Sequence, residues 1–147
     1  MTHMDASKVK ETVDAHIEPL MRAVGVPHWR ITVDYEPLPE GSVAEIDFQS
    51  VDYWRAFITF DPAKCTDEDH VIRCLLHEIL HILAAPFVVY RNVMRAGMDA
   101  ESPEGEREDR LWCYAMEQQV VMLERGLAAD LRKADTDTPP VTAGGDP

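Results

Sequence analysis

The chain has 147 residues, of which 46% are hydrophobic, and its formal net charge is −13 at pH 7. This length and apolar content suit a single domain with its own hydrophobic core. The negative charge and the scattering of Lys and Arg argue against the basic patch that binds a phosphate backbone, so we expect no nucleic-acid partner. We interpret the charge mainly as a contribution to solubility, with a preference for basic substrates or partners as the alternative.

The sequence also bears on the compartment. It contains no run of about 18 consecutive apolar residues, the length that spans a bilayer. Its first residues lack the charged and then apolar pattern of a secretory signal. Cys65, Cys74 and Cys113 have no paired spacing that would indicate a disulfide framework. We therefore expect a cytoplasmic protein with free thiols and no membrane contact.

Residues 6–24 are expected to form the first helix, because apolar residues recur there at intervals of three and four. Pro19 falls inside this pattern, where it can kink or split the helix. Gly25 and Pro27 then end it.

Three strands follow at residues 29–35, 43–49 and 53–60, where apolar and polar residues alternate. Their aromatic and β-branched content, with short turns between them, favours an antiparallel meander. The third strand is either an interior strand or an edge strand that can pair with an extended peptide.

Two further helices are expected. The first runs from about residue 66 to Ala85, stops before Pro86, and is apolar nearly all round, which is typical of a buried central helix. Residues 87–101 are ambiguous between a loop and a short helix, and Gly97 permits them to act as a lid. The second helix covers about residues 102–133. The sequence thus predicts an α+β fold in one domain, residues 1–133, with a disordered tail at 134–147.

The central helix carries the motif His77-Glu78-Ile79-Leu80-His81. Histidines four positions apart project from one face of a helix, so both rings can bind a single ion. Glu78 lies about 100° further round and can accept a proton from water that the ion activates. Buried ionisable groups are costly unless they are paired or ligated, which favours a metal site over coincidence.

A catalytic zinc usually has three protein ligands and one open position. No His follows the motif, so the third ligand is a downstream carboxylate, Cys113 or the upstream His70. Glu117 and Glu124 both interrupt apolar faces of the last helix and have no other evident reason to lie there. The residues alone leave these two acids open.

The stretch from Leu76 to Phe87, followed by Glu117-Gln118-Gln119-Val120-Val121, resembles the compact HExxH metallopeptidase-like proteins of phages and prophages. Those proteins are similar to minimal gluzincins of the zincin class. The resemblance covers about residues 28–127. It implies a zincin-like fold, with His77, His81 and Glu117 as ligands of one Zn²⁺ per chain and Glu78 as the general base.

The expected activity is therefore zinc-dependent hydrolysis of a peptide or protein substrate, with a backbone group or a tyrosine as donor to the developing oxyanion. Tyr114 and Tyr90 are the candidate tyrosines, and the alternative for each is an ordinary core or rim residue. The alternative is a zinc-stabilised interaction or assembly module with little turnover. A third interpretation, an acidic inhibitor of a basic protein, rests only on net charge. The sequence does not indicate the substrate or the oligomeric state.

Overall fold

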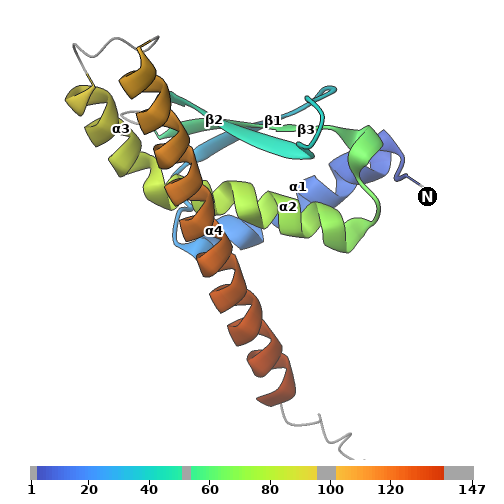
Figure 1. Ribbon diagram of the computed structural model, residues 1–147. Helices are drawn as coiled ribbons and strands as arrows, with labels where there is room; N and C mark the ends of the chain where they lie inside the picture. Colours follow the sequence, from blue (N-terminus) through green and yellow to red (C-terminus); the bar gives the residue numbers. More distant parts are fainter. Residues whose placement is uncertain (1–2, 51–53, 96–101, 138–147) are drawn as a thin grey trace, which may run out of the picture.

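The computed structural model describes residues 3–50, 54–95 and 102–137 (Figure 1). The fold is α+β, as the sequence predicts, with a small mixed sheet and a long C-terminal helix. Helices α1 and α2 lie on the same side of the sheet, and α4 crosses α2 (Figure 1). In chain order the elements are α1 (Ala6–Val24), β1 (Arg30–Tyr35), β2 (Ala44–Ser50), β3 (Arg55–Phe60), the 3₁₀ turn η1 (Pro62–Lys64), α2 (Glu68–His81), the 3₁₀ turn η2 (Ile82–Ala84), α3 (Ala85–Met94) and α4 (Pro103–Asp137).

Helix α1 has the bounds that its periodicity predicts. Gly25 ends it in the left-handed conformation, with φ of 85°, and the Val26 N–H donates to the Met21 carbonyl. These are the features of a Schellman cap, which glycine adopts without steric cost. Pro19 is exposed and does not split the helix.

The three strands have the order β1-β3-β2, so the meander expected from the sequence does not form. Strand β3 lies in the centre, parallel to β1 and antiparallel to β2. Its inward side chains, Ala56, Ile58 and Phe60, are at most 1% exposed. Because β3 is the most deeply buried strand, it takes the position with a partner on each side. The expected third strand is therefore interior, and β1 and β2 are the edge strands.

A charged clamp fixes the connection between β1 and β2. The Lys64 ammonium donates to the carbonyls of Leu38, Pro39 and Ser42 at 2.6, 2.6 and 2.9 Å. It also pairs with the Asp61 carboxylate at 3.2 Å. That carboxylate accepts from the Leu38 N–H, which helps to lower the pKa of Asp61. The clamp sets the path by which the chain enters β2.

Helix α2 begins after Asp67, whose carboxylate accepts from the His70 N–H at 2.8 Å. It ends at His81, and the η2 turn redirects the chain into α3. Pro86 does not terminate a helix here. It lies in the first turn of α3, where its missing N–H has no partner to lose. Helix α3 thus covers residues 87–94 of the region 87–101 that the sequence left ambiguous, and the possible lid residue Gly97 lies outside the described residues.

Within the described residues, the stretch Glu68–Val88 is long and apolar enough to cross a membrane, and half of it is buried inside the protein. The core helix of a soluble protein meets the same criteria, so this finding is weak evidence for a membrane span.

Two apolar clusters hold the elements together. The larger joins α1, the sheet and α2, through side chains such as Val13, Ile58 and Leu75 that are 0% exposed. The smaller joins α2 to α4 through Leu76, Leu80 and Val120. Helix α4 continues to Asp137, beyond the end expected near Lys133, and its C-terminal part extends away from the sheet and the other helices (Figure 1). The rest of the expected tail lies outside the described residues.

Candidate metal centre

The two histidines of the motif lie one turn apart on α2 and face the same side. Their side chains are 24% and 12% exposed, for His77 and His81 respectively. Burial lowers the pKa of His81, an effect that the Glu117 charge opposes and the neighbouring His77 reinforces. The neutral ring that burial favours is the form that binds metals.

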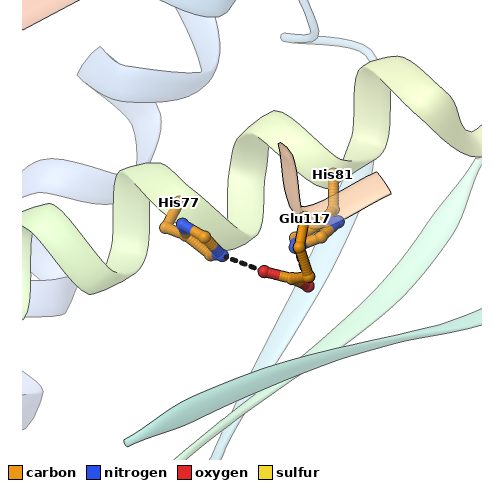
Figure 2. Close-up of side chains that lie close together, drawn as sticks. All are labelled: His77, His81 and Glu117. Atoms are coloured by element: carbon orange, nitrogen blue, oxygen red, sulfur yellow. Dashed lines mark ion pairs between the residues drawn. The ribbon is translucent and has the colours of Figure 1, made fainter. Parts of the chain in front are cut away.

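Glu117 approaches from α4 and bridges the two rings. Its Oε2 lies 3.3 Å from Nε2 of His77, and its Oε1 lies 3.3 Å from Nε2 of His81. Figure 2 shows the carboxylate between the imidazoles. The ligand atoms of these three residues all lie within 4.8 Å of one another, so the group could hold a metal ion.

Glu124 occupies a different place. Its Oε2 lies 3.4 Å from Nδ1 of His77, the ring nitrogen remote from Glu117. It is not one of the three residues that converge. A carboxylate on the second nitrogen of a ligating histidine fixes the tautomer and orientation of the ring. The geometry therefore favours Glu117 as the third ligand and gives Glu124 a supporting contact.

Glu78 points into the protein and is 6% exposed. Burial raises the pKa of Glu78 to about 8, and the charges of Glu117 and Glu45 add to this effect. A hydrogen bond from the Ile46 backbone acts in the opposite direction. A cation beside the carboxylate would also favour its charged form. A buried acid in this setting is costly unless a cation or a proton accompanies it.

These side chains share one groove of about 830 Å³. Strand β2 forms one wall, α2 the floor, and α3 and α4 the opposite side through Val88, Trp112 and Met116. Such a volume is in the range that binds small molecules and short peptide segments. The groove runs beside the free edge of β2, where the backbone has no partner strand and the Ile46 N–H donates to Glu78.

The other residues that the sequence singled out stay outside the cluster. Cys74, Cys113 and His70 line the groove but do not join the three converging residues. His70 Nδ1 is held by Thr66 instead, with contacts of 3.3 and 3.1 Å to its N–H and hydroxyl. Tyr114 is 66% exposed and does not line the groove, and the side chain of Tyr90 lies outside the described residues.

Sequence reasoning missed the contribution of β2. Glu45 and Ile46 border the groove and act on Glu78, yet neither belongs to a motif. Alternation predicts that residues 43–49 form a strand, but nothing in the pattern identifies this strand as the edge beside α2. Only the observed strand order supplies that information.

Comparison of the chain with protein-family models, with curated proteins and with solved structures found no match. What the site can do is therefore argued from its own residues. Two imidazoles and a carboxylate are donors that suit a divalent transition metal, and the buried Glu78 beside them is suited to accept a proton.

Proposed function

We propose that this protein is a zinc-dependent hydrolase that cleaves peptide bonds. The observation that carries the proposal is the separation of the donor atoms. Two ligands on a tetrahedral zinc, with bonds of about 2.1 Å, lie about 3.4 Å apart. The His77 Nε2–Glu117 Oε2 and His81 Nε2–Glu117 Oε1 pairs, which use different carboxylate oxygens, are each 3.3 Å apart, and one donor atom from each of the three residues lies within 4.8 Å of the other two. A His₂Glu set of this size leaves one tetrahedral position free for water or substrate.

In this proposal His77, His81 and Glu117 hold zinc, and Glu124 orients His77. Zinc in this position would act as a Lewis acid and lower the pKa of water toward about 7. Glu78 accepts the proton as water adds to the peptide carbonyl carbon. When the C–N bond breaks, Glu78 returns that proton to the leaving amine. The low exposure of Glu78 keeps bulk water from competing for the same proton.

The edge of β2 supports a peptide substrate over a smaller one. The Val43 carbonyl accepts from the Asp61 N–H at the end of the β2–β3 ladder. Backbone groups alternate in direction along an antiparallel strand, so those of Ala44 and Ile46 face the open edge, where the Ile46 N–H already donates to Glu78. An extended peptide can pair with such an edge and carry its carbonyl past Glu78. The peptide-binding edge considered for residues 53–60 is therefore assigned here to β2.

The test combines metal content with turnover. Wild type, Glu78→Gln and the matched control Glu11→Gln, an exposed site on α1, are purified without metal-affinity resin and loaded with zinc. All three are expected to hold one zinc per chain by elemental analysis. Cleavage of a mixed peptide library, followed by mass spectrometry, is expected to fall by about 10²–10⁴-fold in Glu78→Gln only. Unchanged cleavage by Glu78→Gln would refute the role of this residue.

One observation favours a second candidate, a zinc-stabilised binding module. Helix α4 supplies Glu117 but is joined to α2 mainly through the small cluster around Val120. Zinc would then act chiefly to attach α4 to the rest of the protein. Stoichiometric zinc, with no cleavage of any library member and loss of the α4 contact on chelation, would support this candidate over the enzyme.

A further inference from the structure

We propose that Glu45 makes the groove selective for peptides with a Lys or Arg side chain at the position opposite it. The proposal rests on peptide pairing with β2 as described above and adds the chemical class of substrate. Glu45 carries a charge without a partner: within the described ranges, no ion pair or side-chain hydrogen bond joins Glu45 to any residue. The residue lines the groove, and its side chain is exposed.

The sheet itself offers Glu45 no cation. In the strand register, Glu45 lies opposite Thr59 of β3, and Thr59 lies opposite Asp34 of β1. The row across the sheet thus holds two acids and a neutral residue. Side chains directly opposite one another on neighbouring strands interact, and opposite charges there are stabilising. The one neighbouring position still open to a cation is on the free side of β2.

The geometry of pairing brings that position close. Because the backbone groups of residues 43 and 45 point toward β3, an antiparallel peptide at the free edge meets Glu45 in a non-hydrogen-bonded pair. In such pairs the Cα atoms are only about 4.5 Å apart and the side chains are closest. A long basic side chain can therefore reach the carboxylate while its backbone pairs with Ala44 and with the Ile46 carbonyl, the Ile46 N–H being bonded to Glu78.

The rest of the groove favours the same charge. Among the described residues that line it, the other acids are Glu78, Glu117 and Glu124, and Arg73 is the one Lys or Arg. The Nε of Arg73 donates to the Asp69 carbonyl of its own helix at 3.4 Å, so it does not neutralise Glu45. With zinc held by Glu117 and the histidines, the charge of Glu45 remains uncompensated on the β2 wall. The apolar stem of a Lys or Arg can pack along neighbouring side chains.

The experiment uses the zinc-loaded full chain and two fluorescein-labelled pools of extended peptides, identical except for Lys or Gln at fixed alternate positions. Wild type is expected to bind and cleave the Lys pool better. Glu45→Gln is expected to reduce that advantage about two- to fivefold, the effect of one cross-strand ion pair. Glu45→Lys reverses the preference, and added salt weakens it in wild type. The control Asp34→Asn removes an acid from the same row, two strands from the groove, and leaves the preference unchanged.

The outcomes separate this inference from the proposed hydrolysis. Preferential binding of the Lys pool that depends on Glu45, without cleavage of either pool, supports the inference and refutes hydrolysis. Equal binding and cleavage of both pools supports hydrolysis and overturns the inference. A preference for Lys that survives Glu45→Gln, or binding of neither pool, also overturns it. Circular dichroism of each variant checks that substitution at this exposed position leaves the fold intact.

Discussion

The two parts of the protein that build the candidate metal centre are held very differently. The histidines belong to α2, which is packed against α1 and the sheet through side chains with no exposed surface. The carboxylates belong to α4, whose buried contact with α2 centres on Val120. The large cluster holds the first part, whereas the second is held by a small apolar contact and by the ion pairs of Arg91 and Arg95 with Asp109. A bound ion would therefore act on the less firmly held part.

The largest expected effect is on the α2 side. Leu75→Ala removes a fully buried side chain from the larger cluster and is expected to reduce the free energy of unfolding by about 2–5 kcal/mol. Val120→Ala in the smaller cluster is expected to cost about 1.5 kcal/mol, from the loss of two buried carbon groups. Urea unfolding followed by circular dichroism measures both. Equal losses would show that α4 is held as firmly as α2.

Zinc is expected to stabilise the α4 contact. At free zinc 100-fold above its Kd, the linkage contribution is about 2.7 kcal/mol. Hydrogen exchange should then slow in α4 around Glu117, because opening of this contact requires release of the ion. Glu117→Ala is the matched control, in which zinc is expected to leave the exchange of α4 unchanged. A zinc response that persists in this variant would place the ion elsewhere.

The two acids of α4 are expected to differ in zinc affinity. Glu117→Gln removes a ligand, while Glu124→Gln removes only the contact with His77 Nδ1. The loss for Glu124→Gln is expected to be about 10–100-fold, and the loss for Glu117→Gln larger. Competition with a zinc chelator measures both values. A larger loss of zinc affinity in Glu124→Gln than in Glu117→Gln would make Glu124 the ligand and Glu117 the supporting residue.

The smallest effect concerns acid stability, far from the metal centre. Hydrogen bonds from the Leu38 backbone and the Lys64 ammonium lower the pKa of Asp61 in the folded protein. Its contribution to stability is therefore complete above the unfolded value, about 3.9, and is lost as the pH falls through the lower folded value. Asp61→Asn should show a smaller loss of stability between pH 5 and pH 3 than wild type, in urea titrations at each pH. The same loss of stability between pH 5 and pH 3 in Asp61→Asn and in wild type would contradict this role of Asp61.

The sequence was most informative where a local pattern decides the structure. The periodicity of α1, the alternation in the three strands and the start of α4 after Ser102 each depend on neighbouring residues, and their bounds are nearly as predicted. The pairing of β1 with β3 depends instead on contacts between residues about 25 positions apart. Neither alternation nor turn chemistry specifies that choice.

The same distinction applies to the site. The spacing of His77 and His81 is a property of one helix, so the sequence alone predicts that both face one ion. The choice between Glu117 and Glu124 depends on how α4 crosses α2, because both acids are on the side of α4 that faces the groove. A seven-residue separation returns to nearly the same face of a helix. Only the position of the crossing places Glu117 between the rings and Glu124 beside one of them.

The Lys64 clamp has a consequence of its own. Its ammonium is surrounded by three carbonyls and a carboxylate, much as a macrocyclic host encloses a small spherical cation. The loop between β1 and β2 supplies the three carbonyls, and Lys64 belongs to the η1 turn after β3. Such a shell suits a compact point charge and does not suit the planar fork of a guanidinium. Exchange of lysine for arginine at this position would thus preserve the charge and still release the loop that carries Gly41, Ser42 and Val43 to the mouth of the groove.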